Sequence, residues 1–262
     1  GIAILPVDDP RLEREAALLP EARKLRIGTV GPKTLGSRAD LGDIRVLDYI
    51  PSGAAGSVVR YAVRGEPAVV RLRLAGEHNA RNGAVALAVT CALGLPAAPA
   101  ALAIGGATLP PHRSAVVVLG GRTVLDDCYN ANPASMLAAL RTLTAGMGPV
   151  RRAFAVLGDM LELGPDAKEL HAELGKDAAG LGLTGLVAFG TLGAHFGSGA
   201  RQAGLAESCI FATAEPDLAV ERLCQWTRQG DWILVKASRG MRLERVIDGL
   251  TAAWGPITQQ GG

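Results

Sequence analysis

The 262-residue sequence has few aromatic residues, few cysteines and no surplus of charge of either sign. Aromatic residues make up 4% of the chain, and 27 basic residues nearly balance 25 acidic ones. Proteins that bind nucleic acids or membrane surfaces usually carry a basic stripe, so this balance argues against both partners. The longest apolar run, residues 83–95, is too short to cross a bilayer.

The four cysteines, Cys91, Cys128, Cys209 and Cys224, form no CxxC pair and have no spacing typical of metal ligands. Because each lies in an apolar or mixed setting, we expect reduced, buried thiols and a cytoplasmic protein. His78 lacks a second ligand at metal spacing, so the sequence predicts no metal site. No signal peptide is evident, and the chain is expected to begin inside a domain.

Apolar residues and turns are abundant: 48% of the residues are hydrophobic and 34 are glycine. In the first part of the chain, short Val/Ile/Leu runs alternate with turn residues, which is typical of strands. The predicted strands are 1–5, 25–30, 43–50, 57–63 and 68–75, with a helix at 8–19.

Helical spacing appears at residues 79–94, where Val85, Leu87, Ala88 and Cys91 are predicted to form one apolar stripe. A loose segment follows and ends in the proline-containing run at 109–113. Two prolines make a stiff, extended connection, so we place a domain boundary there. The two predicted domains are residues 1–111 and 112–262.

In the second part of the chain, predicted strands alternate regularly with predicted helices. Strands at 114–119 and 122–127 flank Gly120-Gly121, a predicted hairpin turn. Helices are predicted at 133–145, 166–181, 192–203, 215–228 and 240–253, and they alternate with strands at 154–158, 186–190, 209–212 and 232–236. Such alternation predicts right-handed βαβ crossovers, a mostly parallel sheet and an α/β, Rossmann-like domain.

Polar residues gather where these strands end, which is where open α/β sheets bind ligands. Asp126 and Asp127 end one predicted strand, Asp159 follows another, and Lys236, Ser238 and Arg239 lie at the end of a third. Asn132 precedes Pro133 and is predicted to cap the next helix. The carboxylate of Asp127 is predicted to be free to accept two hydroxyl donors, such as those of a ribose.

A second polar cluster, GEHNARN at 76–82, puts Asn79 and Asn82 on one helix face. Their carboxamides suit a purine edge or a phosphate-bound water, although Asn79 alone could be an N-cap. His171 lies beside Leu170 and Leu174 at helical spacing, which favours a packed or solvent-facing imidazole over a catalytic one.

Taken together, these stretches resemble the Mur ligases. GEHNARNGAVALAVTCALGL, HR, LDDCYNANPASMLAAL, AVLGDMLELG and LVKASR occur in the order seen in that superfamily. The YNANP and GDMLELG segments are similar to one branch, the UDP-N-acetylmuramoyl-tripeptide–D-alanyl-D-alanine ligases (MurF). The resemblance covers nearly the whole chain.

The resemblance implies an ATP- and Mg²⁺-dependent amide ligase of peptidoglycan synthesis, and with it a role in cell shape and division. The reaction implied by the resemblance forms an acyl phosphate on UDP-N-acetylmuramoyl-tripeptide, which the amine of D-Ala-D-Ala then attacks. We expect a monomer. The resemblance implies that Asn79, Asn82, Arg113, Asp127, Asn130 and Asn132 lie near ATP. It also implies that Asp159, Glu162, Lys236, Ser238 and Arg239 face the dipeptide.

The sequence also departs from that pattern. It contains no GxxxxGK[ST] phosphate loop, so the first domain is expected to be only the rear part of a central ATP-binding domain. The sugar-nucleotide domain and most magnesium ligands would lie in an absent N-terminal portion, and this chain alone is expected to be inactive. Ala237 stands where family members usually have glycine, and Cys128 where serine is common.

Two other functions are open. One is a non-catalytic nucleotide- or partner-binding module derived from such a ligase. The other is a Rossmann-type oxidoreductase domain, whose only support is Gly190-Thr-Leu-Gly193 after a strand. That spacing is not GxGxxG, so it is a weak signal.

Overall fold

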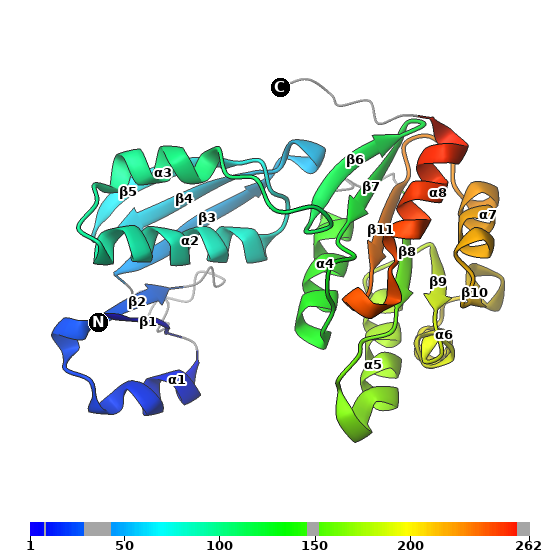
Figure 1. Ribbon diagram of the computed structural model, residues 1–262, viewed down its shortest axis with the longest axis horizontal. Coiled ribbons are helices and arrows are strands. Elements are labelled where there is room, and N and C mark those ends of the chain that lie inside the picture. The colour runs from blue at the N-terminus through cyan, green and yellow to red at the C-terminus, as the bar shows by residue number, and fades with distance from the viewer. Residues whose placement is uncertain (8, 29–42, 146–151, 256–262) are drawn as a thin grey trace. The chain divides into compact units, whose positions relative to one another are not determined.

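The computed structural model describes residues 1–7, 9–28, 43–145 and 152–255, in two compact units, Gly1–Thr108 and Leu109–Gly262 (Figure 1). Each unit has its own sheet and its own hydrophobic core. The predicted α/β class, with a mostly parallel sheet in the second unit, is confirmed. No described helix is both long and apolar enough to cross a membrane.

The first unit holds a five-stranded sheet in the order β1-β2-β3-β4-β5. Its strands are β1 (Ala3–Pro6), β2 (Lys24–Gly28), β3 (Ile44–Pro51), β4 (Ser57–Val63) and β5 (Glu66–Leu72). The first three pair in parallel and the last three antiparallel. Its helices are α1 (Pro10–Glu15), α2 (Glu77–Ala92) and α3 (Ala97–Gly105). The predicted end of the second strand, residues 29–30, lies outside the described residues.

Helix α2 packs closely on this sheet at Tyr61. The tyrosine ring is fully buried, and its hydroxyl donates a hydrogen bond to the Ala80 carbonyl at 2.9 Å. A Cβ on Gly83 would lie 2.4 Å from that hydroxyl oxygen, so only glycine allows the helix to approach this closely.

Two predictions for this unit were wrong. The segment expected to be loose contains α3, because Ala97–Gly105 is alanine-rich and its prolines lie at the cap and in the first turn, where proline is tolerated. Val85 is 44% exposed, whereas Leu87, Ala88 and Cys91 are buried. Two residues correspond to about 200° of helix rotation, so Val85 and Leu87 face different ways.

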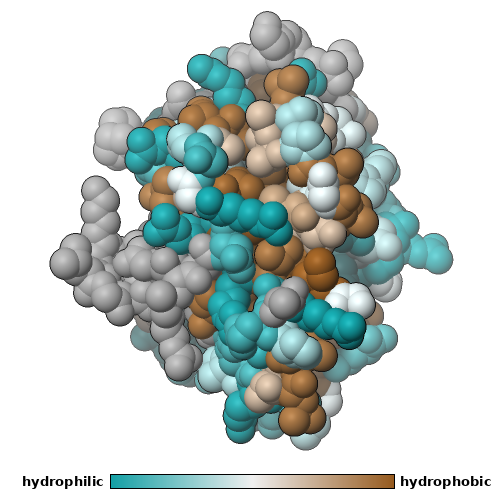
Figure 2. Space-filling model, turned by 90° about the vertical axis from the view of Figure 1, so that its left-hand side faces the viewer, coloured by the Kyte–Doolittle hydropathy of each residue, from teal (hydrophilic) through white to brown (hydrophobic). Residues whose placement is uncertain are grey.

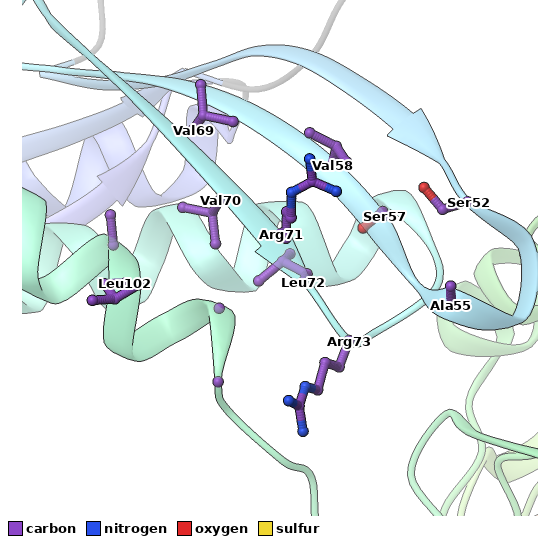
Figure 3. A pocket seen from close by; sticks show the side chains of 13 residues that line it. Ser52, Ala55, Ser57, Val58, Val69, Val70, Arg71, Leu72, Arg73 and Leu102 are labelled. Carbon is purple, nitrogen blue, oxygen red and sulfur yellow. The ribbon is translucent and has the colours of Figure 1, made fainter. Parts of the chain in front are cut away.

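The outer face of α2 is apolar in its second half and at its C-cap residue, Leu93. Val85, Val89 and Leu93 recur every four residues and are 44%, 42% and 71% exposed. Figure 2 shows a face of the molecule on which apolar patches lie between polar ones. A hollow of about 620 Å³ lies against β4, β5 and α3 (Figure 3). It is lined by Val58, Val69, Arg71, Arg73 and the 81% exposed Leu102, among others.

The second unit contains a six-stranded sheet in the order β10-β9-β8-β11-β7-β6. Its strands are β6 (Ala115–Leu119), β7 (Arg122–Asp126), β8 (Ala153–Gly158), β9 (Gly185–Phe189), β10 (Ile210–Thr213) and β11 (Trp232–Lys236). Only β6 runs antiparallel, joined to β7 by Gly120 and Gly121, which both have positive φ. This confirms the predicted hairpin.

Five helices cover the two faces of this sheet: α4 (Pro133–Ala145), α5 (Ala167–Gly180), α6 (Gly193–Gln202), α7 (Pro216–Trp226) and α8 (Glu244–Trp254). One core cluster unites residues of α4, α5 and α6 with one side of the sheet. The other unites residues of α7 and α8 with the opposite side. The unit is therefore a three-layer α/β/α domain (Figure 1).

The last helix does not begin near Gly240, as the sequence had predicted. A short 3₁₀ turn, Arg239–Met241, follows β11, and Arg242 then has a left-handed backbone with φ 49°. That conformation interrupts the helical hydrogen bonds, so α8 begins at Glu244. The end of β11 therefore does not lead directly into a long helix.

Candidate functional site

The candidate site lies at the carboxyl ends of the parallel strands of the second unit. Neighbouring strands β8 and β11 are followed by helices on opposite faces, α5 and α8. In an open α/β sheet such a change of side opens a crevice at the strand ends, where ligands bind. The polar residues predicted from the sequence after β7, β8 and β11 all lie at this edge.

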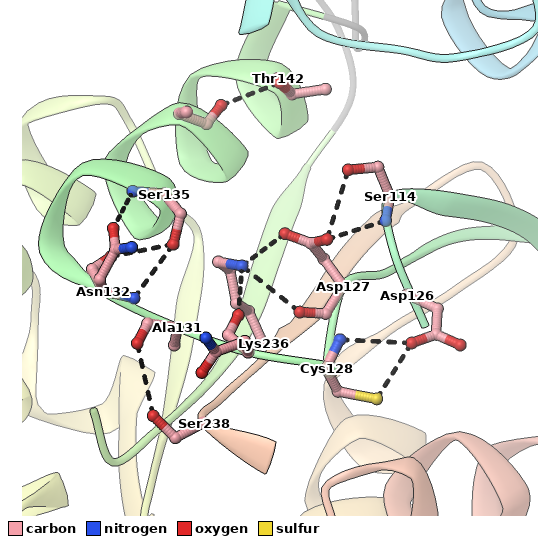
Figure 4. A network of polar contacts seen from close by, with 12 residues as sticks. Ser114, Asp126, Asp127, Cys128, Ala131, Asn132, Ser135, Thr142, Lys236 and Ser238 are labelled. Atoms are coloured by element: carbon pink, nitrogen blue, oxygen red, sulfur yellow. Dashed lines mark hydrogen bonds and ion pairs between the residues drawn. The ribbon is translucent and has the colours of Figure 1, made fainter. Parts of the chain in front are cut away.

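A buried ion pair joins the ends of β7 and β11 (Figure 4). The Lys236 ammonium lies 2.6 Å from Oδ2 of Asp127, and it also donates to the backbone carbonyls of Asp127 and Asn130 at 3.4 and 2.8 Å. Only 3% of the Lys236 side chain is exposed. Lys236 thus has three partners within the protein, which satisfy a charge that would be costly to bury alone.

The other oxygen of Asp127 is also engaged. Oδ1 accepts hydrogen bonds from the backbone N–H of Ser114 at 2.8 Å and from the Ser114 hydroxyl at 3.3 Å. The expectation of a carboxylate free for two ribose hydroxyls therefore differs from the structure. Asp127 instead ties the segment before β6 to the end of β11. The sequence had not singled out Ser114, because nothing in its spacing links it to Asp127.

Asn132 begins helix α4 as predicted. Its side-chain oxygen accepts the N–H of Ser135 at 2.8 Å, and the Ser135 hydroxyl accepts the N–H of Asn132 at 3.0 Å. This reciprocal arrangement is a capping box, which fixes the start of the helix. Asn130 and Asn132 are both exposed beside the buried Lys236, and Asn130 contributes its carbonyl to the lysine.

Asp159, after β8, caps the turn that leads into α6. Its carboxylate accepts hydrogen bonds from the backbone N–H groups of Thr191 and Leu192 at 2.9 and 3.0 Å, and from the Thr191 hydroxyl at 2.9 Å. A Cβ on Gly190 would lie 2.5 Å from this carboxylate. The glycine after β9 therefore makes room for Asp159, and the N–H groups a phosphate would need are already occupied.

Ser238 bridges the loops that follow β8 and β11. Its N–H donates to the Asp159 carbonyl at 3.1 Å, and its hydroxyl oxygen accepts the N–H of Leu161 at 2.9 Å. Ala237, the departure from the usual glycine, is fully buried and lacks a positive φ. A Cβ on Gly158 would lie 2.7 Å from the Ala237 methyl group, so the glycine at 158 accommodates the alanine at 237.

Two of the predicted dipeptide residues face solvent. Arg239 is exposed and donates a hydrogen bond to Oε1 of Glu244 at 3.0 Å, in an ion pair at the surface. Such pairs contribute little to stability, about 0–1 kcal/mol, so the guanidinium can exchange this partner for a ligand. Glu162 is also exposed, on a backbone with φ 65°.

Arg113 lies between two residues, His112 and Ser114, whose backbones are held by hydrogen bonds. Its neighbours His112 and Ser114 both have positive φ, at 63° and 49°. The His112 carbonyl accepts the N–H of Tyr129 at 3.0 Å. The Arg113 guanidinium stacks over the Tyr129 ring at 3.9 Å, so this exposed cation is held in one direction by a cation–π contact.

In the first unit, Asn79 and Asn82 contact one another at the start of α2. The Asn82 amide donates to Oδ1 of Asn79 at 3.4 Å, and the buried Asn79 amide donates to the Ala75 carbonyl at 2.8 Å. Gly76 is the N-cap of this helix, so the alternative role of Asn79 as an N-cap is wrong. Asn82 is exposed on the same helix face.

His171 is a packed core histidine, as the sequence favoured. It is fully buried on α5, with its ring 4.6 Å from that of Phe196. Its Nε2 accepts the N–H of Met160 at 3.0 Å, and its Nδ1 contacts the Ala167 carbonyl. Burial is the main reason why the pKa of His171 is lowered, so the folded unit holds the neutral ring.

We expect acid to destabilise the second unit through His171. Because its pKa is lowered in the fold, this contribution is complete above the ordinary value of about 6.5 and is lost as pH falls below it. Urea unfolding at pH 7.5 and 5.5, followed by tryptophan fluorescence, should show a larger loss in the parent chain than in His171→Gln. His78→Gln, in the first unit, is the control and should leave the pH dependence of the tryptophan signal as in the parent. Equal losses in the parent and His171→Gln would contradict this assignment.

One cluster was not foreseen from the sequence. His112, Asp126 and Cys128 come together at the end of β7, with possible ligand atoms all within 4.8 Å of one another. Nδ1 of His112 lies 2.8 Å from Oδ2 of Asp126, and the Cys128 thiol donates to Oδ1 at 3.0 Å. The sequence predicted no metal ligands because these residues have no recognised spacing.

Comparisons with family models, curated proteins and solved structures all give Mur ligases. Residues 112–239 match the family model described as Mur ligase, glutamate ligase domain. The chain is 35% identical over 272 residues to the UDP-N-acetylmuramoyl-tripeptide–D-alanyl-D-alanine ligase of Mycobacterium tuberculosis, covering 96% of this chain and 51% of the relative. It is similar to the crystal structure of MurF ligase from Thermotoga maritima in complex with ADP, with a TM-score of 0.78 and 25% identity, over 96% of this chain and 53% of that one.

A crystal structure of MurF from Acinetobacter baumannii is similar to the same degree, with a TM-score of 0.79 and 25% identity over 96% of this chain and 52% of that one. The chain spans about half the length of the curated relatives that it matches.

Proposed function

The chain belongs to the Mur ligase family, in the branch of the UDP-N-acetylmuramoyl-tripeptide–D-alanyl-D-alanine ligases, and on this basis we propose that it is part of an ATP-dependent amide ligase. The proposed reaction joins D-Ala-D-Ala to UDP-N-acetylmuramoyl-tripeptide through an acyl phosphate. It would serve peptidoglycan synthesis in the cytoplasm, and hence cell shape and division, with the enzyme acting as a monomer.

The observation that carries this proposal is the convergence of three sequence motifs at one edge of a parallel sheet. DDCYNANP includes the end of β7, GDMLELG the end of β8, and KASR the end of β11. Hydrogen bonds join these segments: Lys236 to Asp127 and Asn130, and Ser238 to Asp159. Residues far apart in the sequence are thus joined at one edge of the sheet, and such a fixed arrangement is what positioning of two substrates requires.

For the nucleotide, we propose Arg113, Asn130 and Asn132 of the second unit and Asn79 and Asn82 of the first. Arg113 is exposed and held over Tyr129, which suits a phosphate contact. Asp127 remains part of this proposal, but its two carboxylate oxygens are engaged by Ser114 and Lys236. Its proposed role is therefore to position the segment that carries Arg113.

The carboxylates at the strand ends do not fit Mg²⁺. Asp126 ends β7, Asp127 follows it and Asp159 follows β8, and all three already contact the protein's own imidazole, thiol, N–H, hydroxyl or ammonium groups. A magnesium ion would need oxygen ligands that are free to coordinate it. We therefore propose that the Mg²⁺ accompanying ATP is held by portions of the enzyme outside this chain.

The first unit is proposed to be the rear part of the central ATP-binding domain, ahead of the C-terminal domain at 112–262. Its support is the exposed apolar stripe of Val85, Val89 and Leu93 on α2, which a complete domain would cover. The alternative function is a non-catalytic nucleotide- or partner-binding module. The oxidoreductase alternative is disfavoured, because Asp159 occupies the N–H groups after Gly190.

The proposed function is tested by measuring phosphate release with ATP, UDP-N-acetylmuramoyl-tripeptide and D-Ala-D-Ala. The complete gene product should release phosphate only when both other substrates are present. The 262-residue chain alone should release none, because it has no phosphate loop to preorganise the γ-phosphate. A complete product that folds and binds ATP but ligates nothing would favour the binding module. Ligation by the chain alone would show that the missing loop is unnecessary.

Arg239 is proposed to bind the carboxylate of D-Ala-D-Ala, with Lys236, Ser238, Asp159 and Glu162 shaping or facing the same crevice. Arg239→Lys keeps the charge but loses the two-pronged geometry that fits a planar carboxylate. In the complete enzyme we expect the KM for D-Ala-D-Ala to rise about tenfold, the equivalent of one lost hydrogen bond to a charged group. The KM for ATP should stay within twofold.

Glu244→Gln provides the control for this variant, because it weakens the surface partner of Arg239 without changing the arginine. It should leave the KM for D-Ala-D-Ala unchanged or slightly lower. An unchanged KM in Arg239→Lys would assign the dipeptide carboxylate to another residue.

A further inference from the structure

Three possible metal ligands of different chemistry meet where the segment before β6 passes the end of β7. Asp126 is the last residue of β7, Cys128 follows two residues later, and His112 approaches from the other side of the hairpin. The carboxylate of Asp126 lies at the centre and contacts the imidazole with one oxygen and the thiol with the other. Figure 4 shows the Asp126 and Cys128 side chains turned toward each other.

The spacing of these atoms suits a small tetrahedral ion. Bonds to zinc of about 2.0–2.3 Å imply that neighbouring ligand atoms lie roughly 3.3–3.8 Å apart. The observed contacts of 2.8 and 3.0 Å, within a cluster no wider than 4.8 Å, need only small side-chain rotations to reach that spacing. A thiolate, an imidazole and a carboxylate are ligands that Zn²⁺ takes, whereas Mg²⁺ and Ca²⁺ prefer oxygen alone.

The surroundings favour a cation. Cys128 is fully buried, and 8% of the Asp126 side chain is exposed. A carboxylate thus lies beside a thiol and an imidazole in a poorly solvated place, where a divalent ion would neutralise its charge.

We propose that His112, Asp126 and Cys128 form a binding site for Zn²⁺ or a similar thiophilic divalent ion. The three side chains supply three ligands, and the partly exposed His112, with 31% of its side chain accessible, leaves a fourth position for water. Binding replaces the proton of the Cys128 thiol with the metal, and that proton passes to solvent.

The site would also tether the segment that contains Arg113. His112 has a left-handed backbone and precedes Arg113 directly. A metal bond to its ring would hold this segment to the end of β7 more firmly than the present hydrogen bond to Asp126. The proposal concerns metal binding alone and does not depend on the ligase reaction.

The test uses the untagged 262-residue chain, reduced and freed of metal with a chelator. Titration with Zn²⁺ against a chromogenic chelator should show one site per chain, with release of a proton. Co²⁺ should give a thiolate-to-cobalt charge-transfer band and the visible bands of a four-coordinate ion. Mg²⁺ should compete with neither metal. A folded chain that takes up no Zn²⁺, or binds Co²⁺ without the thiolate band, overturns the proposal.

Matched variants locate the site. Cys128→Ser keeps a hydroxyl that can donate to Asp126, and it should abolish the thiolate band and weaken Zn²⁺ binding more than tenfold. Cys224→Ser removes a thiol outside the cluster and should change neither result. His112→Gln should weaken binding with Cys128 left in place, and tryptophan fluorescence checks that each variant is folded. Loss of the band in Cys224→Ser, or its persistence in Cys128→Ser, would place the metal elsewhere.

Discussion

Replacing Lys236 with methionine should destabilise the second unit by about 3–5 kcal/mol, the cost of leaving one partner of a buried ion pair without its charge. Methionine retains much of the length of the side chain but provides no ammonium group. The carboxylate of Asp127 would keep its two hydrogen bonds from Ser114 but lose the 2.6 Å contact to Lys236. The carbonyl of Asn130 would also lose its donor.

Tryptophan fluorescence during urea unfolding measures this effect selectively. The three tryptophans, Trp226, Trp232 and Trp254, all belong to the second unit, so the first unit does not contribute to the signal. The double variant Lys236→Met with Asp127→Asn should recover part of the loss, because it removes the unpaired charge as well. If Lys236→Met alone unfolds at the parent's urea concentration, the pair contributes nothing to the stability of this fold.

The second large effect is expected at the contact between α5 and α6. A Cβ on Gly199 would lie 1.8 Å from the Ala172 carbonyl oxygen, and one on Gly175 would lie 2.0 Å from that of Phe196. Both obstacles are backbone atoms of helices, which cannot rotate away. Gly199→Ala must therefore push the two helices apart, and we expect a loss at or above the upper end of the usual range of about 1–3 kcal/mol for overpacking.

Gly180→Ala is the matched control for that substitution. Gly180 ends α5, and a Cβ added there would have no neighbour within 4 Å. Removing a glycine from such a position should leave stability unchanged or raise it by about 0.4–1 kcal/mol. The same urea experiment should thus separate the two alanine variants clearly. Equal stability of Gly199→Ala and Gly180→Ala would mean that the helices are not closely packed.

Local signals in the sequence predicted most elements of the second unit. Helix α4 begins where it was predicted, because Asn132 and Pro133 mark its start by capping chemistry that acts over four residues. The strands that end in Asp126 and Lys236 were recognised from short apolar runs. In each case the deciding interactions lie between residues close together in the chain.

The features that were missed depend on distant residues or on context. Helix α3 was overlooked because prolines usually end helices, and here they lie where a helix can begin. Lys236 and Asp127 are 109 residues apart, and no periodicity connects them. The cluster of His112, Asp126 and Cys128 likewise forms only when the hairpin folds. The sequence therefore predicted which residues lie at the site but not which of them form hydrogen bonds or ion pairs with one another.

The position of β11 has a consequence for synthesis on the ribosome. This strand is the last of the sheet in the sequence, yet it lies between β8 and β7 in the middle of the sheet. Until it emerges, β7 and β8 each lack a neighbour along a buried edge, and open edges of apolar strands invite pairing with other chains. The second unit therefore cannot form its sheet stepwise from its N-terminal side. A chain that stops before Trp232 would lack both the central strand and the lysine that neutralises Asp127. Its sheet would be open and prone to aggregation, and we expect quality-control proteases to degrade it.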